Sequence, residues 1–274
     1  MDTAGKEVIA IVSLSRHATS TYQVERLVES IRGIGEYRGN ILLITDYPDD
    51  YTELQKTEAN FVVFEPDHSM IICRHASHMT AKRLKTSLID IVFGKLNLQS
   101  VEVILYVDMD VVVGSPLLPF FNDVGQMLTK AGTNATMIAQ GQGNSDQPYH
   151  GGVFALNRHS EECLLLWRKF IDESTVNRDQ KALGHALQTT SGCTFKPFSV
   201  SYVNAPTPEY LVEGKRQVFV HITNTHRAHI LDKKAQLKYF TEVLNITKTP
   251  IFSLKVPLKV TQAKNFSIPS LCIK

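Results

Sequence analysis

The stretch VILYVDMDVVVGSP, from Val103 to Pro116, decides how the whole chain is interpreted. Two aspartates, Asp108 and Asp110, stand in the middle of an apolar run that has the character of a strand. A buried charge is costly unless a partner compensates it. Because side chains alternate along a strand, we expect these two carboxylates to point to the same side and to repel each other. A divalent cation relieves both the repulsion and the loss of solvation, so the stretch predicts a metal site.

The position of this motif also indicates what binds beside the metal. In an open parallel sheet, ligands bind at the carboxyl ends of the strands, and Asp108 follows directly on the run VEVILYV. Mg²⁺ and Mn²⁺ take one or two carboxylates and complete their coordination with water and substrate phosphate oxygens. We therefore expect a metal ion together with a phosphorylated small molecule. The simpler interpretation is that the two aspartates only end the strand and cap the turn toward Gly114.

The segments around the motif predict an α/β protein. Strands are expected at 7–14, 40–46, 60–66, 101–113, 136–140, 153–157 and from 217 onward, and amphipathic helices at 21–35, 79–96, 116–132, 161–174 and 179–190. Apolar strands that alternate with such helices imply a mostly parallel sheet covered on both faces. We expect one catalytic domain over 1–248, with a nucleotide-binding half at about 1–114, an acceptor half at about 115–248, and a tail at 249–274.

Composition narrows the classes of partner. The chain has 274 residues, 43% of them hydrophobic, and a formal net charge of 29 − 27 = +2. Without a basic block, nucleic acid is not an expected partner.

No apolar run approaches the about 18 residues that a membrane helix needs, and the N-terminus has no basic segment typical of a signal peptide. As the sequence stands we expect a cytoplasmic protein, or a protein of the Golgi lumen if an N-terminal anchor has been trimmed.

The four cysteines are widely scattered. Cys73, Cys163, Cys193 and Cys272 have neither the spacing of zinc ligands nor that of a CxxC motif. We therefore expect them to be buried free thiols.

Four segments carry a family resemblance. ILYVDMDVVV, YHGGVFALNR, RDQKAL and VFVHITNTHR occur in this order. The chain from Glu7 to about Arg227 resembles the nucleotide-diphospho-sugar transferases of GT-A fold, and is most similar to the glycogenin and galactosyltransferase-like family eight. The resemblance implies a single-domain, Rossmann-like α/β fold and a retaining hexosyltransferase. Such an enzyme moves a sugar from a nucleotide diphosphate donor, here a UDP-sugar, to a glycan, protein or small-molecule acceptor. We also allow for a homodimer.

The resemblance implies three metal ligands. Asp108 and Asp110 match the family's metal-binding pair, and His221 matches its later histidine. An imidazole added to two carboxylates favours Mn²⁺ over Mg²⁺. The alternative for His221 is a histidine packed in the core.

Further residues are matched to the donor and the sugar. The resemblance assigns donor contacts to Ser13, Leu14, Tyr22, Arg74, Lys82, Arg83, Lys85, Asp108, Gly151, Gly152 and Arg227, and catalytic roles to Asp179 and Gln180. Gly151 and Gly152 permit close approach of backbone to a sugar, although the family has Asn-Ser-Gly here. Arg227 would clamp a phosphate through its guanidinium, although the glycine and Pro-Trp of the family's loop are absent. Alternatively, Asp179 only caps its helix.

Two other classes of protein share these features. ILYVDMDVV also fits the hhhhDxDxV motif of the haloacid-dehalogenase-like phosphatases, in which the first aspartate is the nucleophile. That motif usually lies on the first strand of the core, whereas three predicted strands precede it here. The altered HGG and HITNTHR segments are also compatible with a non-catalytic GT-A protein that only binds nucleotide sugar.

Overall fold

The computed structural model describes most of the chain. The described residues are 5–14, 18–67, 70, 77–141, 149–173, 179–189, 192–198, 202–204 and 217–221. The strands are β1 (Glu7–Val12), β2 (Asn40–Ile44), β3 (Phe61–Phe64), β4 (Val103–Val107), β5 (Val111–Val113), β6 (Thr136–Gly141), β7 (Tyr149–Leu156), β8 (Thr194–Pro197), β9 (Tyr202–Asn204) and β10 (Phe219–His221). The helices are α1 (Ala18–Gly33), η1 (Pro48–Tyr51), α2 (Thr52–Thr57), α3 (Ser77–Lys85), η3 (Asp90–Lys95), α4 (Leu118–Ala131), η4 (Arg158–Ser160), α5 (Glu161–Glu173) and α6 (Asp179–Thr189).

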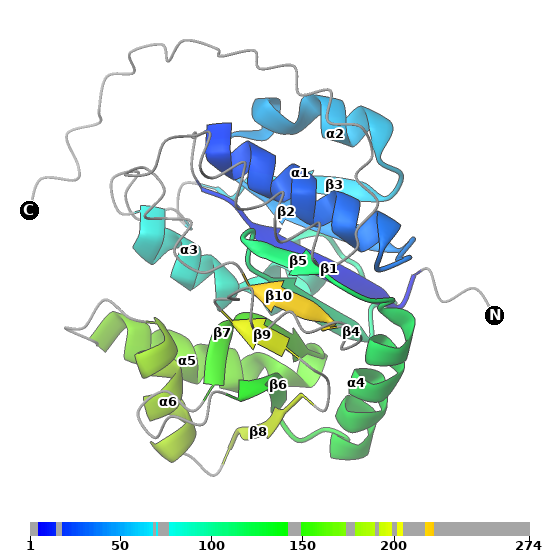
Figure 1. Cartoon of the computed structure of the whole chain (residues 1–274). Coiled ribbons are helices and arrows are strands. Elements are labelled where there is room, and N and C mark those ends of the chain that lie inside the picture. Colours follow the sequence, from blue (N-terminus) through cyan, green and yellow to red (C-terminus); the bar gives the residue numbers. More distant parts are fainter. Residues whose placement is uncertain are drawn as a thin grey trace, which may run out of the picture.

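A seven-stranded sheet forms the centre of the molecule (Figure 1). Its strand order is β3-β2-β1-β4-β7-β6-β8, and β3, β2, β1 and β4 run parallel to one another. β7 runs antiparallel to both of its neighbours, β4 and β6, and β8 is parallel to β6. A small second sheet has the order β5-β10-β9. The predicted mostly parallel α/β sheet is therefore confirmed.

Helices cover both faces of the large sheet because successive strand residues are apolar. In β1, Ile9 and Ile11 pack toward the cluster that includes α1 and α4, whereas Val8 and Ala10 pack toward the cluster that includes α3, α5 and α6. All four side chains are fully buried. This two-sided burial explains why the strand reads as a continuous apolar run rather than an alternating one.

Several local expectations need correction. The expected strand at 101–113 ends at Val107, and Val111 begins a separate strand in the second sheet. The expected helix at 79–96 is interrupted at Thr86–Ser87 and continues as the π-helical turn η3. The sequence also gave no signal for α2, β8 or β9.

The expectation of free thiols is wrong for two of the cysteines. Cys163, in α5, and Cys193, just before β8, form a disulfide with their Cα atoms 5.2 Å apart. Cys73 and Cys272 lie outside the described residues, as does the expected tail at 249–274. Within the parts of the chain that the structure describes, no helix has the length and apolar character needed to cross a membrane.

Candidate metal and donor site

The Asp-x-Asp segment forms a turn between two sheets. β4 ends at Val107, and the Val111 N–H donates a hydrogen bond of 3.1 Å to the Asp108 carbonyl. The chain then enters β5, which pairs antiparallel with β10 so that Val111 faces His221. The two carboxylates therefore meet across a turn rather than along a continuous strand, and the pairing of β5 with β10 brings the histidine to them.

Three side chains converge at this turn. Each of Asp108, Asp110 and His221 offers one ligand atom, and these atoms all lie within 4.8 Å of one another. The His221 Nε2 atom is 2.9 Å from Asp110 Oδ1 and 3.9 Å from Asp108 Oδ2. Two carboxylates and an imidazole form a donor set that suits a divalent cation and leaves coordination positions for water and phosphate. The residues present thus fit a metal ion.

Asp108 is held from the side away from His221. Lys85 Nζ lies 2.8 Å from Asp108 Oδ1, and the Tyr106 hydroxyl donates a hydrogen bond of 2.6 Å to the same oxygen. These contacts leave Oδ2 as the oxygen nearer to His221. Tyr106 was not among the predicted site residues, although it lies on β4 only two positions before Asp108.

Burial and like charge shape the protonation of the site. Burial raises the pKa of Asp108, Lys85 opposes this rise, and the neighbouring Asp110 adds to it. Burial lowers the pKa of His221, but the adjacent Asp110 and Asp108 outweigh that effect, so its pKa is raised overall. Both shifts reflect negative charge crowded in a poorly solvated place. A bound dication would compensate this charge.

Gly151 and Gly152 form the backbone wall of the site. Lys85 Nζ donates to the Gly151 carbonyl at 3.2 Å, and the Asp108 N–H donates to the Gly152 carbonyl at 2.7 Å. A Cβ atom at residue 152 would lie 2.5 Å from His221 Cε1 and 2.7 Å from Asp108 Oδ2. Glycine is therefore needed at 152 for the metal-ligand side chains to fit.

His150 is a second residue that the sequence analysis did not single out. Its Nδ1 atom accepts a hydrogen bond of 3.0 Å from the Gly152 N–H, and its ring packs edge-to-face on His221 with the ring centres 4.6 Å apart. Its place in the quoted segment YHGGVFALNR, directly before the glycines, was the available signal. The ring supports one side of His221.

Comparison with known proteins identifies the fold. No protein-family model matches the chain, and curated protein sequences give no significant match. Among solved structures, an active-site mutant of LgtC is 14% identical, with a TM-score of 0.54, and the match covers 87% of this chain and 95% of that one. A glycosyltransferase involved in glycosylation of the major capsid of PBCV-1 is 15% identical, with a TM-score of 0.49, and the match covers 87% and 99%.

The fold is that of the GT-A glycosyltransferases. Membership of family eight stays a prediction, because the likeness lies in the structure and not in the sequence.

The predicted nucleotide contacts lie at the carboxyl end of β1. The Ser13 N–H donates to the Ile44 carbonyl at 2.9 Å, and its hydroxyl shares a hydrogen bond of 2.9 Å with the hydroxyl of Tyr51. Leu14 is buried in the core. Tyr22 is half-buried on α1, with the Arg26 guanidinium 5.2 Å from the centre of its ring. Ser13 and Leu14 thus follow the carboxyl end of β1, at the edge where open parallel sheets bind ligands.

The basic side chains of helix α3 have different partners and surroundings. Lys85 reaches Asp108, and Lys82 is buried. Arg83 instead pairs with Asp172 of α5, with Nη2 and Oδ1 2.8 Å apart. The structure therefore brings Lys85, but not Arg83, to the metal-ligand cluster.

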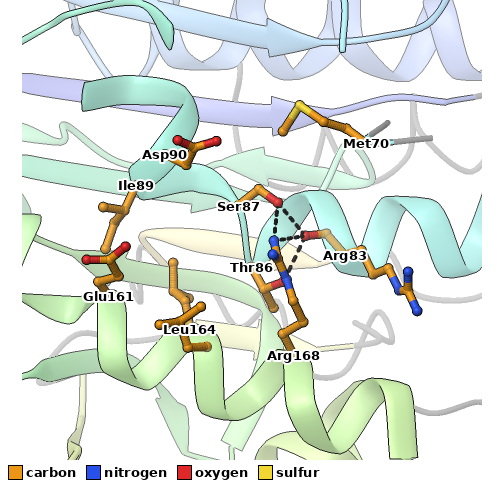
Figure 2. Close-up of a pocket in the computed structure, with 10 residues that line it drawn as sticks. Met70, Arg83, Thr86, Ser87, Ile89, Asp90, Glu161, Leu164 and Arg168 are labelled. Carbon is orange, nitrogen blue, oxygen red and sulfur yellow. Dashed lines mark hydrogen bonds between the residues drawn. The ribbon is translucent and has the colours of Figure 1, made fainter. Parts of the chain in front are cut away.

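A pocket of about 330 Å³ lies on the Arg83 side of α3 (Figure 2). It is lined by Met70, Arg83, Thr86, Ser87, Ile89, Asp90, Glu161, Leu164, Leu165 and Arg168. Arg168 reaches across from α5 and donates hydrogen bonds to Thr86 Oγ1, at 3.0 Å, and to Ser87 Oγ. None of the three metal-ligand candidates lines this pocket, so it is separate from their cluster.

The remaining predicted residues are only partly described. Asp179 and Gln180 open α6, whose residues Ala182, Leu183 and Ala186 are buried. This helix packs against β7 and α5. Arg74 and Arg227 lie outside the described residues.

Proposed function

We propose that the chain is a metal-dependent glycosyltransferase that moves a hexose from a nucleotide diphosphate donor, in the first instance a UDP-sugar, to an acceptor hydroxyl. The observation that carries the proposal is the convergence of Asp108, Asp110 and His221 at the carboxyl end of β4 in a GT-A sheet. Open α/β sheets bind their ligands at this edge, which supports a donor diphosphate beside these metal ligands. The proposed ion is Mn²⁺, with Mg²⁺ as the alternative.

The reaction breaks the bond between the anomeric carbon and the diphosphate and forms one between that carbon and the acceptor oxygen, which gives up its proton. The electron pair of this bond leaves with the diphosphate, so negative charge builds on its oxygen. When bound, the metal supplies Lewis-acid stabilisation of that oxygen. Lys85 contributes a fixed positive charge beside the metal ligands, which is the kind of preorganised electrostatic support that stabilises a charged leaving group.

The other proposed roles follow the family resemblance. Ser13, Leu14 and Tyr22 would contact the nucleoside, and Arg74, Lys82 and Arg227 the phosphates. Gly151 and Gly152 would let the sugar approach the backbone, and Asp179 and Gln180 would orient its hydroxyls at the start of α6. We propose retention of configuration from the family resemblance alone. Arg83 is the least supported donor contact, because its guanidinium is engaged by Asp172.

A binding experiment tests the metal and the nucleotide together. Melting temperatures are measured with UDP, GDP, ADP and CDP, each with and without Mn²⁺, because a ligand bound only by the folded state raises the melting point. We expect a shift that requires both UDP and Mn²⁺ and that is lost in Asp110→Ala. Asp49→Asn, at an exposed position in η1, is the matched control and keeps the shift. Absence of any Mn²⁺-dependent shift in the wild-type chain contradicts the proposal.

Release of UDP from a panel of UDP-hexoses then separates the remaining alternatives. A transferase turns over at least one donor slowly with water and faster with an acceptor. A non-catalytic member of the fold binds Mn²⁺ and UDP but releases none from a sugar donor. A phosphatase instead liberates inorganic phosphate from phosphate esters and forms a beryllofluoride-sensitive aspartyl-phosphate at Asp108.

A further inference from the structure

The disulfide between Cys163 and Cys193 joins a buried cysteine to a half-buried one. Cys163 lies in α5, is fully buried and belongs to the same core cluster as Trp167 and Ile171. Cys193 is half-buried in the segment between α6 and β8. A thiol reductant therefore reaches the bond at the sulfur of Cys193, since attack on a disulfide requires access to one of its sulfurs.

The covalent loop that this bond closes contains all of α6. The last residue of α6, Thr189, stands four positions before Cys193, and α5 and α6 pack side by side (Figure 1). Beside the disulfide, Gly192 sits so close to Glu162 that a Cβ atom at 192 would overlap the Glu162 carboxylate. The chain that leaves α6 is thus fastened to the start of α5 by a bond and by close packing.

α5 has other attachments that do not depend on the disulfide. Asp172 pairs with Arg83, and Arg168 donates to Thr86 and Ser87. Trp167 is fully buried and packs edge-to-face on Phe154 of β7, with ring centres 5.5 Å apart. Apart from the disulfide, α6 is held by its packing against α5 and β7, and its residues Ala182, Leu183 and Ala186 are buried. Breaking the disulfide therefore removes the covalent restraint at the C-terminal end of α6 and leaves α5 in place.

The metal-ligand cluster is built without the hairpin of α5 and α6. Asp108 and Asp110 come from the β4–β5 turn, His221 from β10, and Lys85 from α3. In contrast, Asp179 and Gln180, the proposed sugar contacts, open α6 at the end away from the disulfide, so the bond acts on them through a shift of the whole helix. The disulfide consequently acts on one part of the proposed site and not on the other.

We infer that the Cys163–Cys193 disulfide positions α6 for sugar transfer, so that its reduction slows transfer while metal and diphosphate binding persist. The inference rests on the proposed function. A dithiol reductant attacks Cys193 Sγ and displaces the Cys163 thiolate; its second thiol then resolves the mixed disulfide, which leaves two cysteine thiols and one oxidised reductant. The two electrons of the step come from the dithiol, and reoxidation reverses it.

The test measures binding and turnover on the same full-length chain. Oxidised, dithiol-reduced and reoxidised samples are compared for the Kd of UDP in the presence of Mn²⁺, and for kcat of UDP release from the UDP-hexose that the chain turns over. We expect an unchanged Kd, a kcat about tenfold or more lower after reduction, and recovery on reoxidation, because small displacements of positioning groups have large kinetic effects. The variant Cys163→Ala/Cys193→Ala should behave like the reduced protein and should not respond to the dithiol.

Each result bears on one claim. Equal kcat in the oxidised and reduced wild-type chain overturns the inference while leaving the proposed function intact. If reduction abolishes UDP binding as well as turnover and also lowers the helical circular dichroism signal, the inference is overturned too. The disulfide would then stabilise the whole fold rather than the position of α6. Failure of the oxidised chain to bind UDP and Mn²⁺ contradicts the proposed function instead.

Discussion

Two ion pairs that involve residues of α3 have the same N···O distance but differ in how exposed their side chains are to solvent. Lys85 and Asp108 are 2.8 Å apart, with side chains only 8% and 24% exposed, whereas Arg83 and Asp172 are also 2.8 Å apart but are 35% and 38% exposed. A buried charge must be compensated, and removal of one partner leaves the other in a poorly solvated place. An exposed pair is solvated whether or not it forms, and such pairs are typically worth about 0–1 kcal/mol. Equal distance therefore does not mean equal importance.

The largest expected effect comes from the acidic partner of the buried pair. Asp108→Asn removes a metal ligand and leaves Lys85 without its carboxylate. We expect Mn²⁺ affinity to fall by at least about 100-fold, since even residues that only orient metal ligands contribute about 10–100-fold. Isothermal titration with Mn²⁺ in the presence of UDP measures the change. Asp172→Asn, which removes the acidic partner of the exposed pair, is the matched control and should leave that affinity as it is.

The basic partner of the buried pair is expected to affect turnover more than metal binding. In Lys85→Ala, the three proposed ligands remain and a competing positive charge is gone, so Mn²⁺ should bind at least as tightly as before. Turnover should fall by about 100-fold, the usual effect of removing one group that stabilises developing charge. Steady-state UDP release gives kcat, and titration gives the metal affinity. Parallel loss of both would mean that Lys85 chiefly maintains the structure of the site.

The Mn²⁺ affinity of the cluster of Asp108, Asp110 and His221 should depend on pH in a defined direction. The pKa of His221 is raised above its usual 6.5 and that of Asp108 above its usual 3.8, so protons compete with the metal over a higher pH range than for isolated groups. Mn²⁺ affinity should therefore rise as the pH increases through the pKa of His221, by up to about tenfold per pH unit for each proton released.

The metal-free protein should respond to pH in the opposite sense. A group whose pKa is raised by folding stabilises the fold while it is protonated, and this contribution is lost as the pH rises through the folded pKa. The melting temperature without Mn²⁺ should consequently decline above pH 6.5, whereas that with saturating Mn²⁺ should not. A decline of equal size in both samples would indicate a titrating group outside the cluster.

The smallest effect is expected at the exposed pair. Arg83→Ala removes the ion pair with Asp172, and we expect the free energy of unfolding to fall by less than about 1 kcal/mol. Turnover and Mn²⁺ affinity should stay at the wild-type level. Urea unfolding and the UDP-release assay measure these quantities. A large loss of turnover in this variant would restore Arg83 as a donor contact and remove the contrast between the two faces of α3.

The sequence predicts those features that depend on residue chemistry and on the order of motifs along the chain. The alternation of apolar runs and amphipathic helices predicts the sheet, and the order of the motifs points to Asp108, Asp110 and His221, whose ligand atoms lie within 4.8 Å of one another. Strand alternation does not account for the aspartates, because they meet across a turn and not along a strand. Spacing along a helix could have separated Arg83 from Lys85, since residues two positions apart face different sides.

Other features depend on contacts that no local pattern records. Cys163 and Cys193 are 30 positions apart, and their pairing arises only when the chain that leaves α6 returns to the start of α5. β9 has three residues, too few for a periodic signal, and it is a strand through its parallel pairing with β10. The edge-to-face contact of His150 with His221 likewise joins segments that are distant in sequence.

The reversed direction of β7 decides which part of that strand meets the metal-ligand cluster. Because β7 runs opposite to β4, its first residues and not its last lie beside the end of β4. Gly152 accepts a hydrogen bond from the Asp108 N–H there, and the ring of His150 packs on His221. Substitutions at the start of β7 should therefore alter the metal site, whereas substitutions near Leu156, at the far end of the ladder, should alter core packing.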